Sequence, residues 1–191
     1  MTLASSPAGK PARGASREES PRIDPRAVLA ALEEVADPEI PNVSIVELGM
    51  VERIDVRPDA VTVELLPTFV GCPAIEMIRE SVTARLEAFG RPVRVEMTFS
   101  TPWTSDRISP VGREKLRRSG FAPPPQLGPG AGRGGRALPI VDPTLVVAAP
   151  VECPYCGSTD TTLENVFGPT QCRSIRHCAA CRQPFEAFKP V

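Results

Sequence analysis

Residues 61–86 have the sequence VTVELLPTFVGCPAIEMIRESVTARL, which places a strand, a loop and a helix in immediate succession and decides the fold. In its first five residues, Val61, Val63 and Leu65 alternate with polar residues, and this period of two predicts a half-buried strand. Apolar residues then recur at helical spacing along one stripe: Ile75, Ile78, Val82 and Leu86. Gly90 follows as the expected C-terminal stop of this helix.

Further elements flank this unit on both sides. Asp24 and Pro25 provide an N-cap and a first-turn proline for a helix that ends before Pro38. Alternating apolar residues predict additional strands over residues 50–56 and 93–99, and a weaker helix follows over 109–118. The order α-β-β-α-β predicts a small two-layer α+β domain.

Composition divides the chain of 191 residues into four parts. Residues 1–24 are rich in Ser, Ala, Pro, Gly and Arg, so we expect a disordered tail. Residues 122–139 contain five prolines and five glycines, which predicts a flexible linker over 122–149. The α+β domain with its helical extension should therefore occupy residues 25–121, and a second module residues 150–191.

Charge and hydropathy exclude several classes of partner. The longest apolar run near the C-terminal third, residues 145–149, is far too short to span a membrane. The first seven residues lack the apolar stretch of a secretory signal, so we expect a cytoplasmic protein. A net charge of −1 gives no electrostatic reason to expect nucleic acid or an anionic membrane as partner.

Cys72 lies at the start of the second predicted helix. Because it precedes Pro73, we expect it at the N-cap, where backbone N–H groups and the helix dipole favour a thiolate. Gly71 lets the backbone approach a ligand closely. Two interpretations remain open: a reactive or metal-ligating sulfur, or a small buried hydrophobic residue.

Residues 37–41, DPEIP, combine two carboxylates with two prolines in one short turn. The prolines restrict the turn to an extended shape. The segment either only stops the preceding helix, or it brings oxygen ligands or acid–base groups from Asp37 and Glu39 near Cys72. Nothing in the local sequence decides between these alternatives.

The C-terminal module has a metal-binding cysteine pattern. Its two C-x-x-C pairs, separated by 21 residues, are Cys153 with Cys156 and Cys178 with Cys181. Four thiolates delivered in pairs match a closed tetrahedral Zn²⁺ site, so we expect a zinc ribbon with strands over residues 161–166 and 172–177. Structural zinc is favoured over a rubredoxin-like iron site or a redox pair, because nothing here prepares a substrate pocket. A module of about 40 residues is near the lower limit for folding without a metal.

Two further residues of this module are left over. Cys172 is interpreted as a packed strand residue, with a fifth thiol for partner or metal exchange as the alternative. His177 is interpreted as a strand-surface imidazole, although it could compete as a ligand. Basic and acidic residues balance in the module and aromatic residues do not alternate with them, so we expect a protein partner rather than nucleic acid.

Three stretches of the first domain carry a family resemblance: DPE at 37–39, VELGMV at 46–51 and TFVGCP at 68–73. Their order and spacing resemble the SufT/MIP18-like domain of iron–sulfur assembly factors. The resemblance implies that Cys72 handles a metal or cluster, with Thr68, Asp37 and Glu39 around it. A single sulfur would need further ligands or a second protomer.

The combination narrows the resemblance. With residues 99–104 (FSTPWT), 109–116 (SPVGREKL) and 178–185 (CAACRQPF), the chain resembles the PaaD family, a component of the bacterial ring-1,2-phenylacetyl-CoA epoxidase. The resemblance covers about residues 25–122 and 150–191 and fails over the tail and the linker.

This resemblance implies an accessory subunit in aerobic phenylacetate degradation that assists assembly or repair of iron or iron–sulfur centres. Its partners would be the oxygenase and reductase subunits. The alternative is a structural subunit that bridges the two without handling metal. The sequence has no Glu-x-x-His pair for a di-iron site and no dinucleotide fingerprint, so a non-catalytic role is favoured over an enzyme. A thiol enzyme using Cys72 is the weakest interpretation, since the single histidine lies across the linker.

Overall fold

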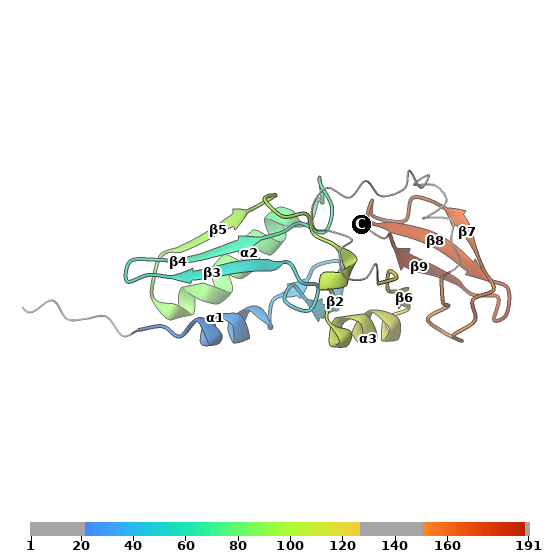
Figure 1. Ribbon diagram of the computed structural model, residues 1–191, viewed down its shortest axis with the longest axis horizontal. Coiled ribbons are helices and arrows are strands. Elements are labelled where there is room, and N and C mark those ends of the chain that lie inside the picture. The colour runs from blue at the N-terminus through green and yellow to red at the C-terminus, as the bar shows by residue number, and fades with distance from the viewer. Residues whose placement is uncertain (1–21, 127–150, 190–191) are drawn as a thin grey trace, which may run out of the picture.

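The computed structural model describes residues 22–126 and 151–189 and shows two modules side by side (Figure 1). The first contains the helices α1 (Pro25–Leu32) and α2 (Ile75–Leu86) and a three-stranded sheet of β3 (Val51–Val56), β4 (Val61–Leu65) and β5 (Val93–Met97). Helix α1 contacts α2 and β3, while α2 contacts β5. The predicted α+β class is therefore confirmed.

Strand β4 is the centre of this sheet, as its alternation predicts. It pairs antiparallel with β3 and parallel with β5, with Val63 opposite both Ile54 and Val95. Val61, Val63 and Leu65 are fully buried, and the stripe of α2 supplies three buried residues from the helix layer: Ile78, Val82 and Leu86. The 3-10 turn η1 (Glu87–Phe89) then ends at Gly90, whose φ of 68° is the left-handed conformation that favours glycine.

Both proline-led helices begin as the sequence predicts. The side chain of Asp24 accepts a hydrogen bond from the Arg26 amide at the start of α1. The Ser109 hydroxyl accepts one from the Gly112 amide, 2.9 Å away, at the start of α3 (Pro110–Arg118). These caps fix where each helix leaves the preceding loop.

A short hairpin that the sequence analysis does not predict lies between α1 and β3. It consists of β1 (Ala36–Asp37) and β2 (Ile40–Ser44), so the DPEIP segment forms a hairpin turn as well as a helix stop. After it, the Ser44 hydroxyl accepts from the Glu47 amide and Glu47 Oε2 accepts from the Ser44 amide, in the manner of a capping box. This turn anchors the C-terminal extension, because the Trp103 indole donates to the Leu48 carbonyl at 2.9 Å.

The second module is a four-stranded sheet in the order β6-β9-β8-β7. Its strands are β7 (Thr161–Asn165), β8 (Arg173–Cys178) and β9 (Pro184–Phe188), with β6 (Phe121–Ala122) added from the end of the first domain. Strand β6 pairs parallel with β9, which places Ala122 opposite Ala187. The linker expected over 122–149 thus starts with a buried strand residue; residues 127–150, like 1–21 of the expected tail, lie outside the described residues.

The two modules share one apolar core. Cys172 and Phe188 of the ribbon belong to the hydrophobic cluster formed by α1, α2 and the three-stranded sheet. The ring of Phe188 meets Phe121 edge-to-face, with 6.4 Å between the ring centroids. The ribbon is therefore docked on the first domain, although the two pieces are far apart in sequence.

Candidate functional site

Cys72 lies in the turn before α2, not at its N-cap. The N-cap is Ala74, which has helical φ and ψ, and the Cys72 carbonyl accepts from the Ile75 amide at 3.4 Å. The expected N-cap position of Cys72 is wrong because Pro73 and Ala74 add a further turn between the cysteine and the helix. Gly71 supports this turn with a φ of 85°.

The Cys72 thiol is half-buried and is not a preformed thiolate. Burial is the largest effect and raises its pKa, and the hydrogen bond from the Ala74 amide opposes this only in part. The nearby Cys172, Glu39 and Asp37 raise the pKa further because negative charge on them disfavours a thiolate. Cys72 therefore ionises readily only if a cation joins the group.

The hairpin turn between β1 and β2 brings both predicted carboxylates toward this thiol. Asp37 Oδ1 accepts from the amides of Glu39 and Ile40, at 2.9 and 3.0 Å, which fixes the Asp37 carboxyl in the turn. Burial, followed by the negative charge of Glu39, raises the pKa of Asp37 above 3.8 despite these hydrogen bonds. Of the two interpretations of this segment, the structure shows the one in which oxygen donors approach Cys72.

Thr68 lies in the same loop as Cys72, on its apolar side. It lines a cavity of about 260 Å³ together with Phe69, Phe99 and Trp103. Phe99 is 65% exposed at the edge of this cavity. The loop therefore separates an apolar hollow from the thiol and carboxylate group.

Cys172 is the residue that the sequence analysis did not connect to this site. It lies just before β8, is 9% exposed, and packs in the same apolar cluster as Cys72. Burial raises the pKa of its thiol, and the charge of Glu39 adds to this effect. The only sequence signal was arithmetic, since a tetrathiolate uses four of the five ribbon cysteines and leaves this one over. We call Cys72, Cys172, Asp37 and Glu39 the interdomain cluster.

Arg173 connects the interdomain cluster to the ribbon sheet. Its side chain is 7% exposed, and its guanidinium contacts Glu39 at 3.4 Å and Glu186 at 2.8 Å. It also lies over the Phe121 ring, 5.2 Å from the ring centroid. The sequence analysis counted Arg173 among the surface charges of the ribbon, but it is a buried cation between the modules.

The predicted metal site of the ribbon is present. The sulfurs of Cys153, Cys156, Cys178 and Cys181 all lie within 4.8 Å of one another. Each C-x-x-C turn is closed by a backbone hydrogen bond from the residue after its second cysteine, Gly157 to Cys153 and Arg182 to Cys178. Gly157 and Arg182 both have positive φ, 75° and 60°, so the two turns have the same conformation.

The protonation pattern of these four thiols fits a bound dication. Backbone N–H donation, first from Cys181, lowers the pKa of Cys178 to about 7. At Cys181 a backbone hydrogen bond from Gln183 is outweighed by burial and by the neighbouring sulfurs, which raise its pKa to about 12. Four crowded thiols cannot all ionise unless a cation offsets their charge, and the donor set is that of a closed tetrathiolate metal site.

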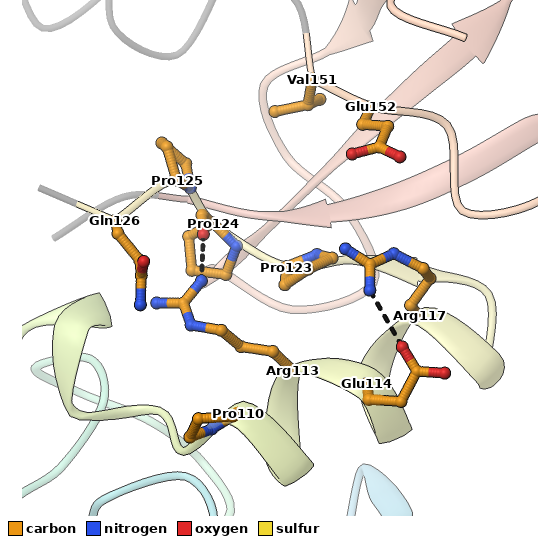
Figure 2. Close-up of a pocket in the computed structure, with 10 residues that line it drawn as sticks. All are labelled: Pro110, Arg113, Glu114, Arg117, Pro123, Pro124, Pro125, Gln126, Val151 and Glu152. Carbon is orange, nitrogen blue, oxygen red and sulfur yellow. Dashed lines mark hydrogen bonds and ion pairs between the residues drawn. The ribbon is translucent and has the colours of Figure 1, made fainter. Parts of the chain in front are cut away.

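A separate cavity of about 630 Å³ lies away from these sulfurs, between α3 and the proline segment (Figure 2). Its cations are already engaged: Arg113 donates to the Pro124 carbonyl, and Arg117 pairs with Glu114 at 3.0 Å. The cavity therefore offers a ligand no cation that is without a protein partner. Across the part of the chain that the structure describes, none of the helices has the length and apolar character needed to cross a bilayer.

Comparison with known proteins agrees with this division. A family model described as an iron–sulfur cluster assembly protein matches residues 25–102, and one described as the PaaD zinc beta ribbon domain matches residues 141–189. The fold and the cysteine pattern thus define an iron–sulfur-assembly-type domain joined to a zinc β-ribbon.

Most of the chain also matches one relative from end to end. It is 35% identical over 166 residues to a protein of Escherichia coli (strain K12) that is assigned as the PaaD component of 1,2-phenylacetyl-CoA epoxidase, and the match covers 86% of this chain and 92% of that one. The chain belongs to this family, the PaaD family.

The first domain is also similar to shorter proteins. An Fe-S protein maturation auxiliary factor of Porphyromonas gingivalis is 35% identical over 97 residues, which is 49% of this chain and 89% of that protein. A crystal structure of a domain of unknown function from Bacillus anthracis is 27% identical with a TM-score of 0.45, covering 48% of this chain and 89% of that one.

Proposed function

We propose that this chain is an accessory subunit of a phenylacetyl-CoA epoxidase system in aerobic phenylacetate degradation, and that it assists assembly or repair of the iron or iron–sulfur centres of that system. Membership of the PaaD family supports the place in the epoxidase system. The match of residues 25–102 to iron–sulfur cluster assembly proteins supports the metal-handling role. The protein would act in the cytoplasm, on the oxygenase and reductase subunits.

The observation that carries the metal-handling role is the surroundings of Cys72. This sulfur is half-exposed, so a cargo ion can reach it, and two carboxylates lie close enough to influence its ionisation. Thiolate and carboxylate donors together suit an iron ion. In this proposal Cys72 transiently holds the iron or cluster, Asp37 and Glu39 complete its surroundings, and Thr68 shapes the loop.

The raised pKa of Cys72 suits a cargo that must leave again. Because burial and nearby negative charge disfavour the free thiolate, iron binding must displace a proton from the sulfur. Reprotonation then competes with the metal and favours release. In the tetrathiolate, by contrast, four sulfurs close the coordination sphere, and we assign that site to structural Zn²⁺, which would stabilise the ribbon.

The test is co-expression of the epoxidase subunits with the native chain or with Cys72→Ala or Cys72→Ser, under anaerobic conditions. We expect both variants to fold and to retain the ribbon metal, while the oxygenase or reductase is isolated with deficient iron or sulfide. Ser81→Ala on the exposed face of α2 is the matched control and should leave loading unchanged. Full iron and sulfide content with both cysteine variants would refute the proposal.

A bridging subunit without a metal role makes the opposite prediction. It would co-purify stoichiometrically with the oxygenase and reductase, and the activity of the complex would not depend on Cys72. The exposed Phe99 beside the Cys72 loop is the kind of apolar side chain that such contacts use, so this alternative stays second.

A further inference from the structure

The chemistry of Cys72 is incomplete within its own domain, because one sulfur and two carboxylates leave an iron ion without a second soft ligand. The ribbon brings such a ligand to the same place. Cys172 packs in the apolar cluster that Cys72 contacts, and both thiols respond electrostatically to Glu39. The two cysteines therefore meet across the boundary between the modules.

The position of Cys172 is fixed by the ribbon backbone and is not that of a loose loop. Its carbonyl accepts from the Lys189 amide at 2.9 Å, which continues the β8–β9 pairing beyond Arg173 and Phe188. Phe188 itself is 6% exposed in the shared core. The sheet of the ribbon thus holds this thiol against the first domain.

The hydrogen bonds around Cys172 favour its ionised form. Thr170 Oγ1 accepts from Arg173 Nε at 2.8 Å, so the hydroxyl proton is free to point elsewhere. The Cys172 sulfur lies 3.2 Å from the same oxygen, and a hydroxyl donated to sulfur stabilises a thiolate. Arg173 adds positive charge beside the cluster and holds Glu39 in an ion pair.

We propose that Cys172 is the second sulfur ligand of an interdomain site that binds a single Fe²⁺ ion together with Cys72 and the carboxylates of Glu39 and Asp37. This inference rests on the proposed function and deepens it, because it makes the ribbon part of the cargo site. Two thiolates with two carboxylates form a mixed sulfur and oxygen donor set that suits exchangeable iron better than the all-sulfur ribbon site does.

The interdomain site closes around the ion only when the ion arrives. Among the described residues, the four ribbon cysteines are the group whose ligand atoms already lie within 4.8 Å of one another. Side-chain rotation at Cys72 and exchange of Glu39 from Arg173 to the metal are the movements that closure requires. Arg173 keeps its contact with Glu186 when Glu39 leaves, so its charge stays paired.

The test uses the full-length chain with one equivalent of Zn²⁺ in the ribbon, titrated anaerobically with Co²⁺ as the probe. We expect one further equivalent of cobalt to bind with thiolate-to-cobalt charge-transfer absorption. Cys72→Ser and Cys172→Ser should each reduce that absorption to about half and weaken cobalt binding at least ~10-fold, since even partners of metal ligands change affinity by 10–100-fold. His177→Ala, a half-buried position on β8, is the control and should change neither quantity.

The outcomes separate the two claims. If Cys172→Ser binds cobalt with native absorption and affinity while Cys72→Ser does not, the second ligand is refuted and the proposed function stands. If the zinc-loaded native chain binds no further cobalt, the interdomain metal site is refuted; the co-expression test on Cys72 then decides the proposed function alone. Zinc content of one equivalent in each variant shows that the ribbon is intact.

Discussion

Replacing Arg173 with leucine should undock the ribbon and expose Cys172. The guanidinium is 7% exposed and contacts two carboxylates, Glu186 at 2.8 Å and Glu39 at 3.4 Å. Removing one partner of a buried ion pair costs about 3–5 kcal/mol. The lower end applies here, because Glu39 and Glu186 are 21% and 27% exposed and water can solvate them in part. We therefore expect about 3 kcal/mol less docking free energy.

The assay is thiol modification in a Cys72→Ser background. In that chain Cys172 is the only cysteine outside the metal-bound tetrathiolate, so its reaction with a thiol reagent reports undocking alone. A loss of about 3 kcal/mol corresponds to a modification rate about 100-fold higher, at about 1.36 kcal/mol for each tenfold change. Arg94→Leu, at an exposed position on β5, is the matched control. An unchanged rate in the Arg173→Leu chain would show that this arginine does not hold the modules together.

Three further predictions follow from other contacts. Gly49→Ala should destabilise the first domain by several kcal/mol in urea unfolding, because φ is 68° and a Cβ would lie 2.4 Å from the Arg107 carbonyl oxygen; a loss below about 1 kcal/mol would contradict this. Burial of Glu47 is outweighed by its pairing with Lys115, so its pKa lies below 4.5 and its stabilisation, complete above that pH, is lost as the pH falls through the lowered value. Glu47→Gln should remove that part of the acid dependence of unfolding, and an unchanged profile would argue against it. Chelation of the ribbon metal should unfold β7–β9 and leave α1 and β3–β5 protected in amide exchange, whereas retained ribbon protection would exclude a folding role for the metal.

The elements that could be predicted from the sequence are those with a local cause. The Asp24 and Ser109 caps, the alternation of β4 and the paired cysteines each determine structure within a few residues, and the structure contains all of them. The hairpin of β1 and β2 escaped prediction because it is short and contains Pro41, which lowers the strand signal.

The remaining features depend on contacts between distant residues. Strand β6 is two residues long, and its pairing with β9 has no local pattern. Arg173 has the composition of a surface residue, and only the meeting of Glu39, Glu186 and Phe121 around it makes burial favourable. The same long-range docking brings Cys172 to Cys72, so the ribbon's share of the interdomain cluster could not be assigned before the modules were seen together.

The two sulfur groups of this chain differ in a way that fits different tasks. The ribbon cysteines are held by matched backbone turns and surround an ion with four sulfurs, which leaves no coordination position for transfer. The interdomain cluster has thiols with raised pKa, carboxylates that have other partners, and a half-exposed sulfur. An ion bound there competes with protons and with Arg173, so it is held less tightly and can pass to a stronger acceptor. A chain that delivers metal needs the second kind of site, and the first kind supplies the rigid sheet that positions Cys172.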